Sequence, residues 1–176
     1  VMYLTFDDGP EPEATGMVME IMDRFEAKGT FFCIGQNIEK HPQTYSSLKK
    51  KGHQVGNHTY SHPSGWKTPD EIYFDEVKQC DKFVSAKLFR PPDGRITLAQ
   101  INFIKQTHRI IMWDVLSGDF DLSVSKEKCL KNVVNNAGSG SVVVFHDKEK
   151  AVKKLEFALP RILEHFANQG YKFKTI

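Results

Sequence analysis

The chain has 176 residues, of which 40% are hydrophobic and 26% are charged, and its formal net charge at pH 7 is +2. This length suits one domain with a substantial buried core and is too short for two comfortable ones, so we expect a single domain over residues 1–176. The near-neutral charge argues against a nucleic-acid partner, because the only compact basic run is Lys49-Lys50-Lys51. No apolar run approaches the roughly 20 residues of a membrane-spanning helix.

The three cysteines, Cys33, Cys80 and Cys129, are far apart in the sequence and odd in number. Without a CxxC spacing they predict buried or unpaired thiols rather than a zinc knuckle or a redox pair. No signal peptide is visible, because Val1 opens directly into a strand-like run. We therefore expect any export signal to lie upstream of these residues.

Seven short apolar runs are predicted to form strands. Three of them (TFFCIG, IIMWDVL and SVVVF) are continuous rather than alternating, which is typical of parallel strands that are buried on both faces. In chain order the predicted strands are Met2–Phe6, Thr30–Gly35, Gln54–Asn57, Leu88–Arg90, Arg109–Leu116, Ser141–Phe145 and Tyr171–Ile176.

Helical patterns lie between these runs. Apolar residues recur at three- and four-residue steps over 13–28, and Gly29 follows that segment. A second pattern covers 69–86, where Pro69 occupies a favoured first-turn position. Weaker patterns predict helices over 42–51, 98–107, 125–137 and 152–169. In the last of these, Pro160 is expected to kink or split the helix. The alternation of strand and helix predicts a parallel α/β fold, either a barrel or an open sheet.

Carboxylates and imidazoles follow five of the predicted strands. A barrel places its active residues at the carboxyl ends of several strands, so these side chains are expected on one rim. They are Asp7 and Asp8 after the first strand, His58 after the third, Asp93 after the fourth, Asp119 after the fifth, and His146 and Asp147 after the sixth.

Asp7 and Asp8 are adjacent carboxylates within the sequence TFDDGP. Such neighbours repel each other, and a nearby cation relieves the repulsion. Gly9 and Pro10 turn the chain sharply, so both side chains can face one site although neighbours on a strand normally diverge. The alternative is an exposed turn that caps the helix beginning near Glu13.

His58 and His62 are four residues apart, a spacing that puts two imidazoles on one face of a helical turn, where they can bind one metal ion. With Asp8 they make three protein ligands and leave positions open for water, as catalytic metal sites require. Zinc is the first choice, and Fe²⁺, Co²⁺ or Ni²⁺ also suit two histidines and one carboxylate. The alternative is a pair of exposed loop histidines.

His146 ends the apolar run VVVFH. Beside a metal site its imidazole is a candidate general acid, because it can protonate a leaving amine near neutral pH. Without such a site it would be an ordinary rim residue. Arg90, in the sequence FRPPDGR, is well placed to pair with a carboxylate such as Asp7; its alternative role is a surface ion pair.

These motifs resemble those of the NodB-like polysaccharide deacetylases, carbohydrate esterase family four, and run in the expected order from Leu4 to Asp147. The resemblance implies a distorted (β/α) barrel of about seven parallel strands. It also implies a metal-dependent hydrolase that removes N-acetyl groups from a polysaccharide containing N-acetylglucosamine, such as peptidoglycan or a chitin-like polymer. The implied substrate is thus an acetylated polysaccharide.

The resemblance assigns a role to each motif residue. It implies that Asp8, His58 and His62 bind the metal and that Asp7 is the general base. Arg90 would be the ion-pair partner of Asp7. His146 would be the general acid, with Asp119 holding its imidazole.

Two residues depart from the family pattern. Asp93 stands where the family usually has tyrosine, at a position whose backbone N–H contributes to the oxyanion hole. Phe120 stands where the family often has tryptophan, at the wall of the acetyl pocket with Val144. Both departures bear on substrate preference and turnover rather than on the class of reaction.

Two rival functions remain open at this point. An O-acetyl esterase acting on acetylated xylan would use the same site chemistry. A catalytically silent carbohydrate-binding protein on the same fold is the second rival, and Asp93 is its only support. Because the family generally works on envelope or extracellular polysaccharides, we expect export to the periplasm, the cell envelope or the extracellular space. The sequence leaves the oligomeric state open.

Overall fold

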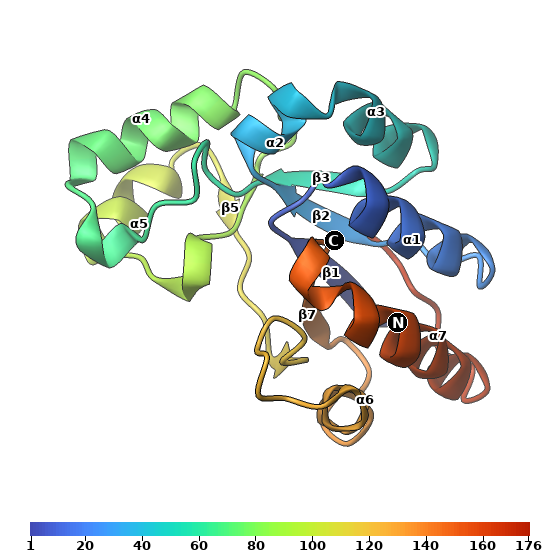
Figure 1. Cartoon of the computed structure of the whole chain (residues 1–176). Helices are drawn as coiled ribbons and strands as arrows, with labels where there is room; N and C mark the ends of the chain where they lie inside the picture. Colours follow the sequence, from blue (N-terminus) through green and yellow to red (C-terminus); the bar gives the residue numbers. More distant parts are fainter.

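The computed structural model describes residues 1–176, in which seven parallel strands form one curled sheet with helices on its outside (Figure 1). The strands are β1 (Tyr3–Asp7), β2 (Thr30–Cys33), β3 (Gln54–Asn57), β4 (Leu88–Phe89), β5 (Arg109–Ile110), β6 (Val115–Leu116) and β7 (Val142–His146). Their order across the sheet is β5-β4-β3-β2-β1-β7-β6. The predicted parallel α/β barrel class is therefore confirmed, and the barrel is a half-barrel that is open between β5 and β6.

The prediction of a single strand over Arg109–Leu116 is wrong. Its first two residues form β5 beside β4, and its last two form β6 beside β7, so one run contributes to both edges of the sheet. Its continuous apolar character reflects burial and contains no information about which strand it pairs with. The four residues 111–114 join the two edges.

This connection explains why the sheet curls. Seven flat strands about 4.8 Å apart would place their edges roughly 29 Å from each other. The five peptide units from Ile110 to Val115 span at most about 18 Å. The sheet must therefore bend toward closure, which brings the carboxyl ends of its strands around a common rim.

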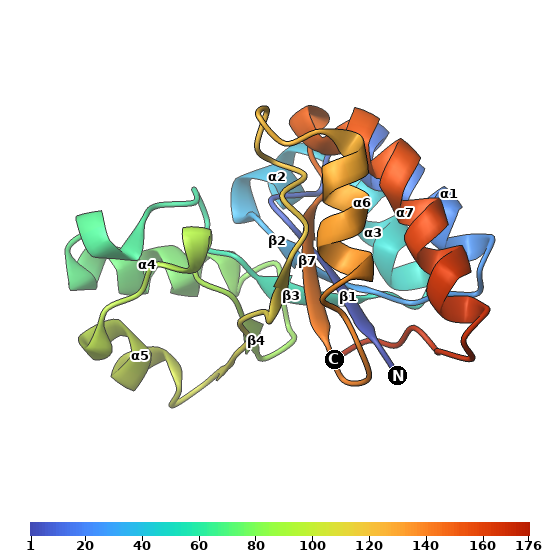
Figure 2. The same ribbon diagram turned by 90° about the horizontal axis from the view of Figure 1, so that it is seen from below.

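The helices lie between successive strands, as the alternating pattern predicts, except the last one, which follows the last strand. They are α1 (Pro12–Asp23), α2 (Gly35–Lys40), α3 (Pro42–Lys50), α4 (Asp70–Cys80), α5 (Leu98–Ile104), α6 (Lys126–Val134) and α7 (Val152–Ala167). Short 3₁₀ turns cover Gly65–Lys67, Pro92–Gly94 and Glu149–Ala151. Helix α2 was not predicted, because its six residues, GQNIEK, contain a single apolar side chain and therefore no hydrophobic periodicity. Figure 2 shows α4 and α5 on one side of the molecule and α1, α6 and α7 on the other.

Two further expectations are corrected at the C-terminal end of the chain. Pro160 does not split its helix, because α7 runs unbroken from Val152 to Ala167, with one buried face of leucine, isoleucine and alanine. The segment Tyr171–Ile176 forms no strand and makes a single parallel bridge, between Phe173 and Met2. This bridge brings the two ends of the chain side by side (Figure 2).

The main hydrophobic core contains 29 buried residues between the sheet and helices α1, α2, α3, α6 and α7. A second cluster of four, Tyr73, Val77, Phe89 and Ile104, lies beneath α4 and α5. All three cysteines are buried and unpaired, as predicted. No helix has the combination of length and apolarity that crossing a membrane demands.

Candidate active site

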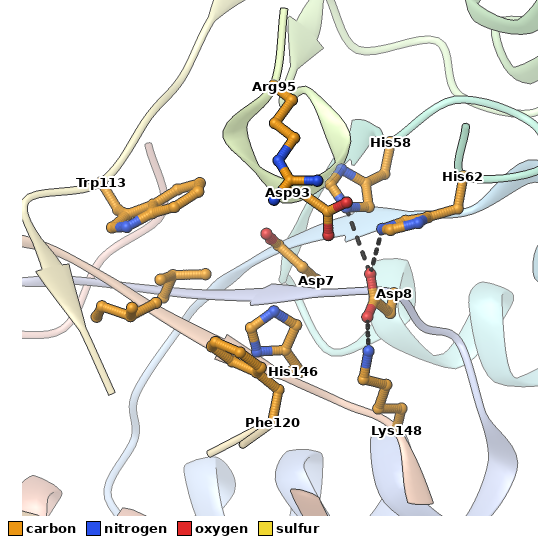
Figure 3. Close-up of a pocket in the computed structure, with 12 residues that line it drawn as sticks. Asp7, Asp8, His58, His62, Asp93, Arg95, Trp113, Phe120, His146 and Lys148 are labelled. Atoms are coloured by element: carbon orange, nitrogen blue, oxygen red, sulfur yellow. Dashed lines mark hydrogen bonds and ion pairs between the residues drawn. The ribbon is translucent and has the colours of Figure 1, made fainter. Parts of the chain in front are cut away.

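The carboxyl ends of the strands surround a pocket of about 350 Å³ (Figure 3). It collects most of the side chains that the sequence singled out. The lining residues are Asp7, Asp8, His58, His62, Asp93, Arg95, Trp113, Leu116, Phe120, Val144, His146 and Lys148. Arg90 and Asp119 lie directly behind this lining, fully buried.

The turn after β1 directs Asp7 and Asp8 to the same pocket. Asp7 is the last residue of the strand, and Asp8 has a φ of 80°, a left-handed conformation that reverses the usual alternation of side chains. The Asn37 amide donates a hydrogen bond of 2.7 Å to the Asp8 carbonyl and holds this turn. The alternative of a helix-capping turn is wrong, because the residue that caps α1 is Glu11 and its side chain makes no cap hydrogen bond.

His58, His62 and Asp8 direct their ligand atoms to one point. The two Nε2 atoms lie 3.4 and 3.2 Å from Asp8 Oδ1, and the three ligand atoms are all within 4.8 Å of one another. The histidines do not share a helical turn, as their spacing suggested. They lie in a loop after β3 in which Thr59 and His62 both have positive φ, and this loop brings the rings within 5.1 Å of each other.

The hydrogen bonds around this cluster fit a bound cation. The Nδ1–H of His58 donates to the Arg90 carbonyl over 2.8 Å, since a carbonyl can only accept, and this leaves the lone pair of Nε2 facing Asp8. Asp8 Oδ1 is buried and has no hydrogen-bond partner. Two acceptors that face each other need a positive charge between them, which a divalent ion with an Asp-His-His donor set supplies.

The charge on Asp8 is favoured even though the side chain is buried. Burial raises the pKa of its carboxyl, but the neighbouring imidazoles of His58 and His62 lower this pKa by more, so the net shift is downward. Lys148 contacts the second carboxylate oxygen, Oδ2, as Figure 3 shows. Oδ1 is therefore the oxygen that remains for a metal ion.

Arg90 holds Asp7 in place. Its Nη1 lies 2.8 Å from Asp7 Oδ1 and donates to the Thr5 hydroxyl over 2.7 Å. The same guanidinium donates from Nε to the Ile111 carbonyl and from Nη2 to the Met112 carbonyl. Arg90 thus connects β1 and β4 with the segment that joins β5 to β6. Its charge is fully buried and balanced by a carboxylate.

His146 and Asp119 form a second buried pair. Asp119 Oδ1 is 2.8 Å from His146 Nδ1, and Oδ2 accepts a 2.7 Å hydrogen bond from the His146 backbone N–H. Burial lowers the pKa of His146, but its hydrogen bond to Asp119 and the negative charges of Asp119, Asp7 and Asp8 raise it overall above the usual 6.5. The Nε2 atom faces the pocket, and the raised pKa favours its protonated form.

Three further predicted residues, Asp93, Phe120 and Val144, also lie at the pocket. Asp147 does not, because its fully buried carboxylate accepts hydrogen bonds from the Gly9 N–H and the Thr15 hydroxyl instead. Asp93 is in the 3₁₀ turn after β4 with a φ of 55°, and its carboxylate lies near His62 (Figure 3). The neighbouring N–H groups of Gly94 and Arg95 donate to backbone carbonyls, whereas that of Asp93 has no such partner. Phe120 packs edge-on against His146, and Val144 lies on β7.

Sequence reasoning missed four lining residues: Arg95, Trp113, Leu116 and Lys148. Trp113 and Leu116 belong to the run that was read as one buried strand, and its split between two edges is what exposes them to the pocket. Arg95 directly follows PPDG, and Lys148 follows His146-Asp147. The signal that could have identified Arg95 and Lys148 as pocket residues was their position directly after motifs that lie at the rim.

A family model for polysaccharide deacetylases matches residues 1–108, more than half of the chain. The chain belongs to the polysaccharide deacetylase family. It is a deacetylase of the NodB-like type, carbohydrate esterase family four, as the motifs predicted. In this hydrolase the seven parallel strands hold acidic and histidine side chains at one rim.

Individual relatives agree with this assignment. A peptidoglycan-N-acetylglucosamine deacetylase from Bacillus cereus is 32% identical over all of this chain and 86% of its own length. The peptidoglycan-N-acetylmuramic acid deacetylase PdaC from Bacillus subtilis is 28% identical, and the chain spans 38% of its length. The solved structure of the peptidoglycan N-acetylglucosamine deacetylase Bc1960, in complex with a naphthyl N-oxidanyl-benzamide, has a TM-score of 0.94 at 31% identity and covers 99% of this chain and 85% of its own.

Proposed function

We propose that this deacetylase hydrolyses N-acetyl groups of an N-acetylglucosamine-containing polysaccharide of the cell envelope, with a divalent metal ion at Asp8, His58 and His62. One observation supports the proposal: three groups of side chains face one pocket. They are a cluster able to bind a metal ion, the candidate base Asp7 paired with Arg90, and the candidate acid His146 paired with Asp119. The names of the relatives, which refer to peptidoglycan, support this polymer as the substrate.

The three ligand side chains suit zinc first, and Fe²⁺, Co²⁺ or Ni²⁺ as alternatives. When bound, such an ion would polarise the acetyl carbonyl and acidify a water molecule. The chain's own contribution is to present the ligand atoms in the correct state. The carbonyl of Arg90 fixes the His58 tautomer, and Asn37 fixes the backbone of Asp8.

Asp7 is the general base in this proposal. It accepts a proton from the attacking water through its free oxygen, Oδ2, while Oδ1 stays bound to Arg90. The buried guanidinium fixes the side-chain rotamer of Asp7 before attack. Placement of this kind lowers the entropic cost of bringing base and water together.

The developing oxyanion is stabilised by the free N–H of Asp93. Removal of one such donor typically costs about 3–4 kcal/mol of transition-state stabilisation. Because the donor is a backbone group, the identity of the side chain is secondary. Phe120, Val144 and Leu116 provide apolar surface for the acetyl methyl group.

His146 completes the reaction as the general acid. Its Nε2–H donates a proton to the departing nitrogen, which leaves as a free amine together with acetate. Asp119 fixes the orientation of the ring through Nδ1 and raises the fraction that is protonated. An acid with a pKa close to the working pH transfers its proton efficiently.

The substrate class is tested by measuring acetate and new amino groups. Zinc-loaded protein is incubated with N-acetylglucosamine oligomers, peptidoglycan and acetylated xylan, with chelator-treated protein as the control. We expect acetate together with free amine from the first two. Acetate from xylan alone would show an O-acetyl esterase, and no acetate from any polymer would favour the silent carbohydrate-binding alternative.

A further inference from the structure

Trp66 is a large aromatic side chain that lies on the surface close to the pocket. It is 68% exposed and sits in the 3₁₀ turn Gly65–Lys67, four residues after His62. The guanidinium of Arg95, which lines the pocket, lies 5.6 Å from the centre of the indole. Trp66 is therefore at the rim, one side chain away from the catalytic groups.

The indole is held rigidly in spite of its exposure. Its Nε1–H donates to the Ile96 carbonyl over 3.2 Å, and the Gln100 amide donates to the Gly65 carbonyl over 2.9 Å. A side chain at Gly65 would collide with the Arg95 carbonyl and with Gln100, because a Cβ there would lie 2.4 and 2.5 Å from them. The turn is thus pressed against the segment that carries Arg95, and the ring face is fixed before any ligand arrives.

Arg95 contributes an unpaired positive charge at the same place. Its side chain makes no hydrogen bond or ion pair within the chain, in contrast to Arg90 and Lys148. In Figure 3 its guanidinium points into the pocket above Asp93. The guanidinium thus lies next to an indole ring that is largely exposed, and its N–H donors have no hydrogen-bond partner within the chain.

A polymer substrate must extend past the pocket. A volume of about 350 Å³ is at the small end of the range for ligand pockets, so the sugars on either side of the reacting one lie along the rim. A pyranose ring has an apolar face of C–H groups and an edge of hydroxyl oxygens. A fixed aromatic ring beside free donors matches both features at low entropic cost.

We propose that Trp66 and Arg95 form a binding subsite for the sugar next to the one that is deacetylated. The indole stacks on the apolar face of that sugar, and the guanidinium donates hydrogen bonds to its hydroxyl or acyl oxygens. This subsite rests on the proposed function and gives the enzyme a preference for longer chains, because binding away from the reacting group raises the rate on extended substrates.

The test compares chain lengths. The ratio of kcat/KM for the N-acetylglucosamine pentamer to that for the dimer is measured in the parent, Trp66→Ala, Trp66→Phe and Lys67→Ala. We expect the ratio to fall about five- to tenfold in Trp66→Ala and to recover largely in Trp66→Phe. Lys67 is the exposed neighbour in the same turn, and its variant serves as the matched control with an unchanged ratio. An unchanged ratio in Trp66→Ala would overturn the subsite.

Binding without turnover separates this proposal from the proposed function. Calorimetry on zinc-loaded Asp7→Asn measures the affinity for the pentamer, and the same measurement is made with Trp66→Ala or Arg95→Ala added. We expect each addition to weaken binding at least fivefold. If the parent released no acetate while this difference persisted, the subsite would stand and the catalytic proposal would fail. Equal affinities in the three proteins would contradict the subsite.

Discussion

Asp7 and Asp8 are chemically identical neighbours that the fold places in different surroundings. Asp7 faces the buried guanidinium of Arg90, whereas Asp8 faces the two imidazoles of His58 and His62. The left-handed backbone at Asp8 makes this division possible, because a regular strand would direct the two carboxylates to opposite faces. The proposed base and the proposed metal ligand can thus be adjacent in the sequence.

At the same scale, Asp119 sets the protonation of His146. Asp119→Asn removes the negative charge that raises the pKa of His146, so this pKa is expected to fall. Activity requires the protonated imidazole and declines as pH rises through its pKa. The alkaline limb of the kcat profile should therefore move to lower pH in Asp119→Asn, with a lower maximum. An alkaline limb at the same pH in both proteins would show that another group sets it.

Asp93 provides a test of the backbone role at the oxyanion position. Because its side chain is exposed and lies outside the converging ligand set, we expect Asp93→Tyr to preserve zinc content and to keep or raise kcat. Any gain should stay below about tenfold, since solvent screens an exposed charge.

The contrary hypothesis makes Asp93 an added metal ligand or a contact to a cationic, partly deacetylated sugar. Zinc content and kinetics on fully and partly acetylated oligomers distinguish the two hypotheses. Loss of zinc, or a KM raised only for partly deacetylated chains, would support the second.

At the scale of elements, Arg90 supplies hydrogen bonds where the sheet has none. Strands β5 and β6 do not pair with each other, and the carbonyls of Ile111 and Met112 between them accept from the guanidinium instead. The side chain that holds Asp7, the proposed base, therefore also stabilises the open side of the half-barrel.

This dual role predicts a large stability effect. Arg90→Met leaves the buried charge of Asp7 unpaired, and breaking a buried ion pair in this way typically costs about 3–5 kcal/mol. Urea denaturation should show a loss of that size. The double variant Asp7→Asn/Arg90→Met removes both charges and should recover part of it. A loss below about 1 kcal/mol in the single variant would mean that the pair contributes little.

The elements also show how far the sequence predicts the fold. Runs such as TFFC and VVVF identify β2 and β7, because burial on both faces leaves a continuous apolar signature. The same signature in IIMWDVL cannot reveal that its two halves lie at opposite edges, since pairing depends on sequence-distant partners. The spacing of His58 and His62 predicted their proximity correctly and their helical conformation incorrectly. Two left-handed residues produce the same result in a loop.

At the scale of the whole molecule, the site depends on closure of the sheet. Asp8 directly follows β1, the histidines lie in the loop after β3, and the His146–Asp119 pair comes from β7 and the segment after β6. These strands lie close together in the sheet because its order runs outward from β1 in both directions, to β2 and β3 on one side and to β7 and β6 on the other. Motifs spread over 140 residues thus meet in one pocket, which is why their order along the chain was informative. Trp113 lies between motifs and was therefore missed.

The central claim is that one pocket holds a metal ion and separate acid and base groups for deacetylation. The most direct measurement determines bound zinc and acetate release from an N-acetylglucosamine pentamer in the same samples of parent, Asp7→Asn and His62→Ala. We predict one zinc and rapid release for the parent, one zinc with release lowered about 10²- to 10⁴-fold for Asp7→Asn, and loss of both for His62→Ala. Stoichiometric zinc in His62→Ala, or parental turnover in Asp7→Asn, would contradict the account.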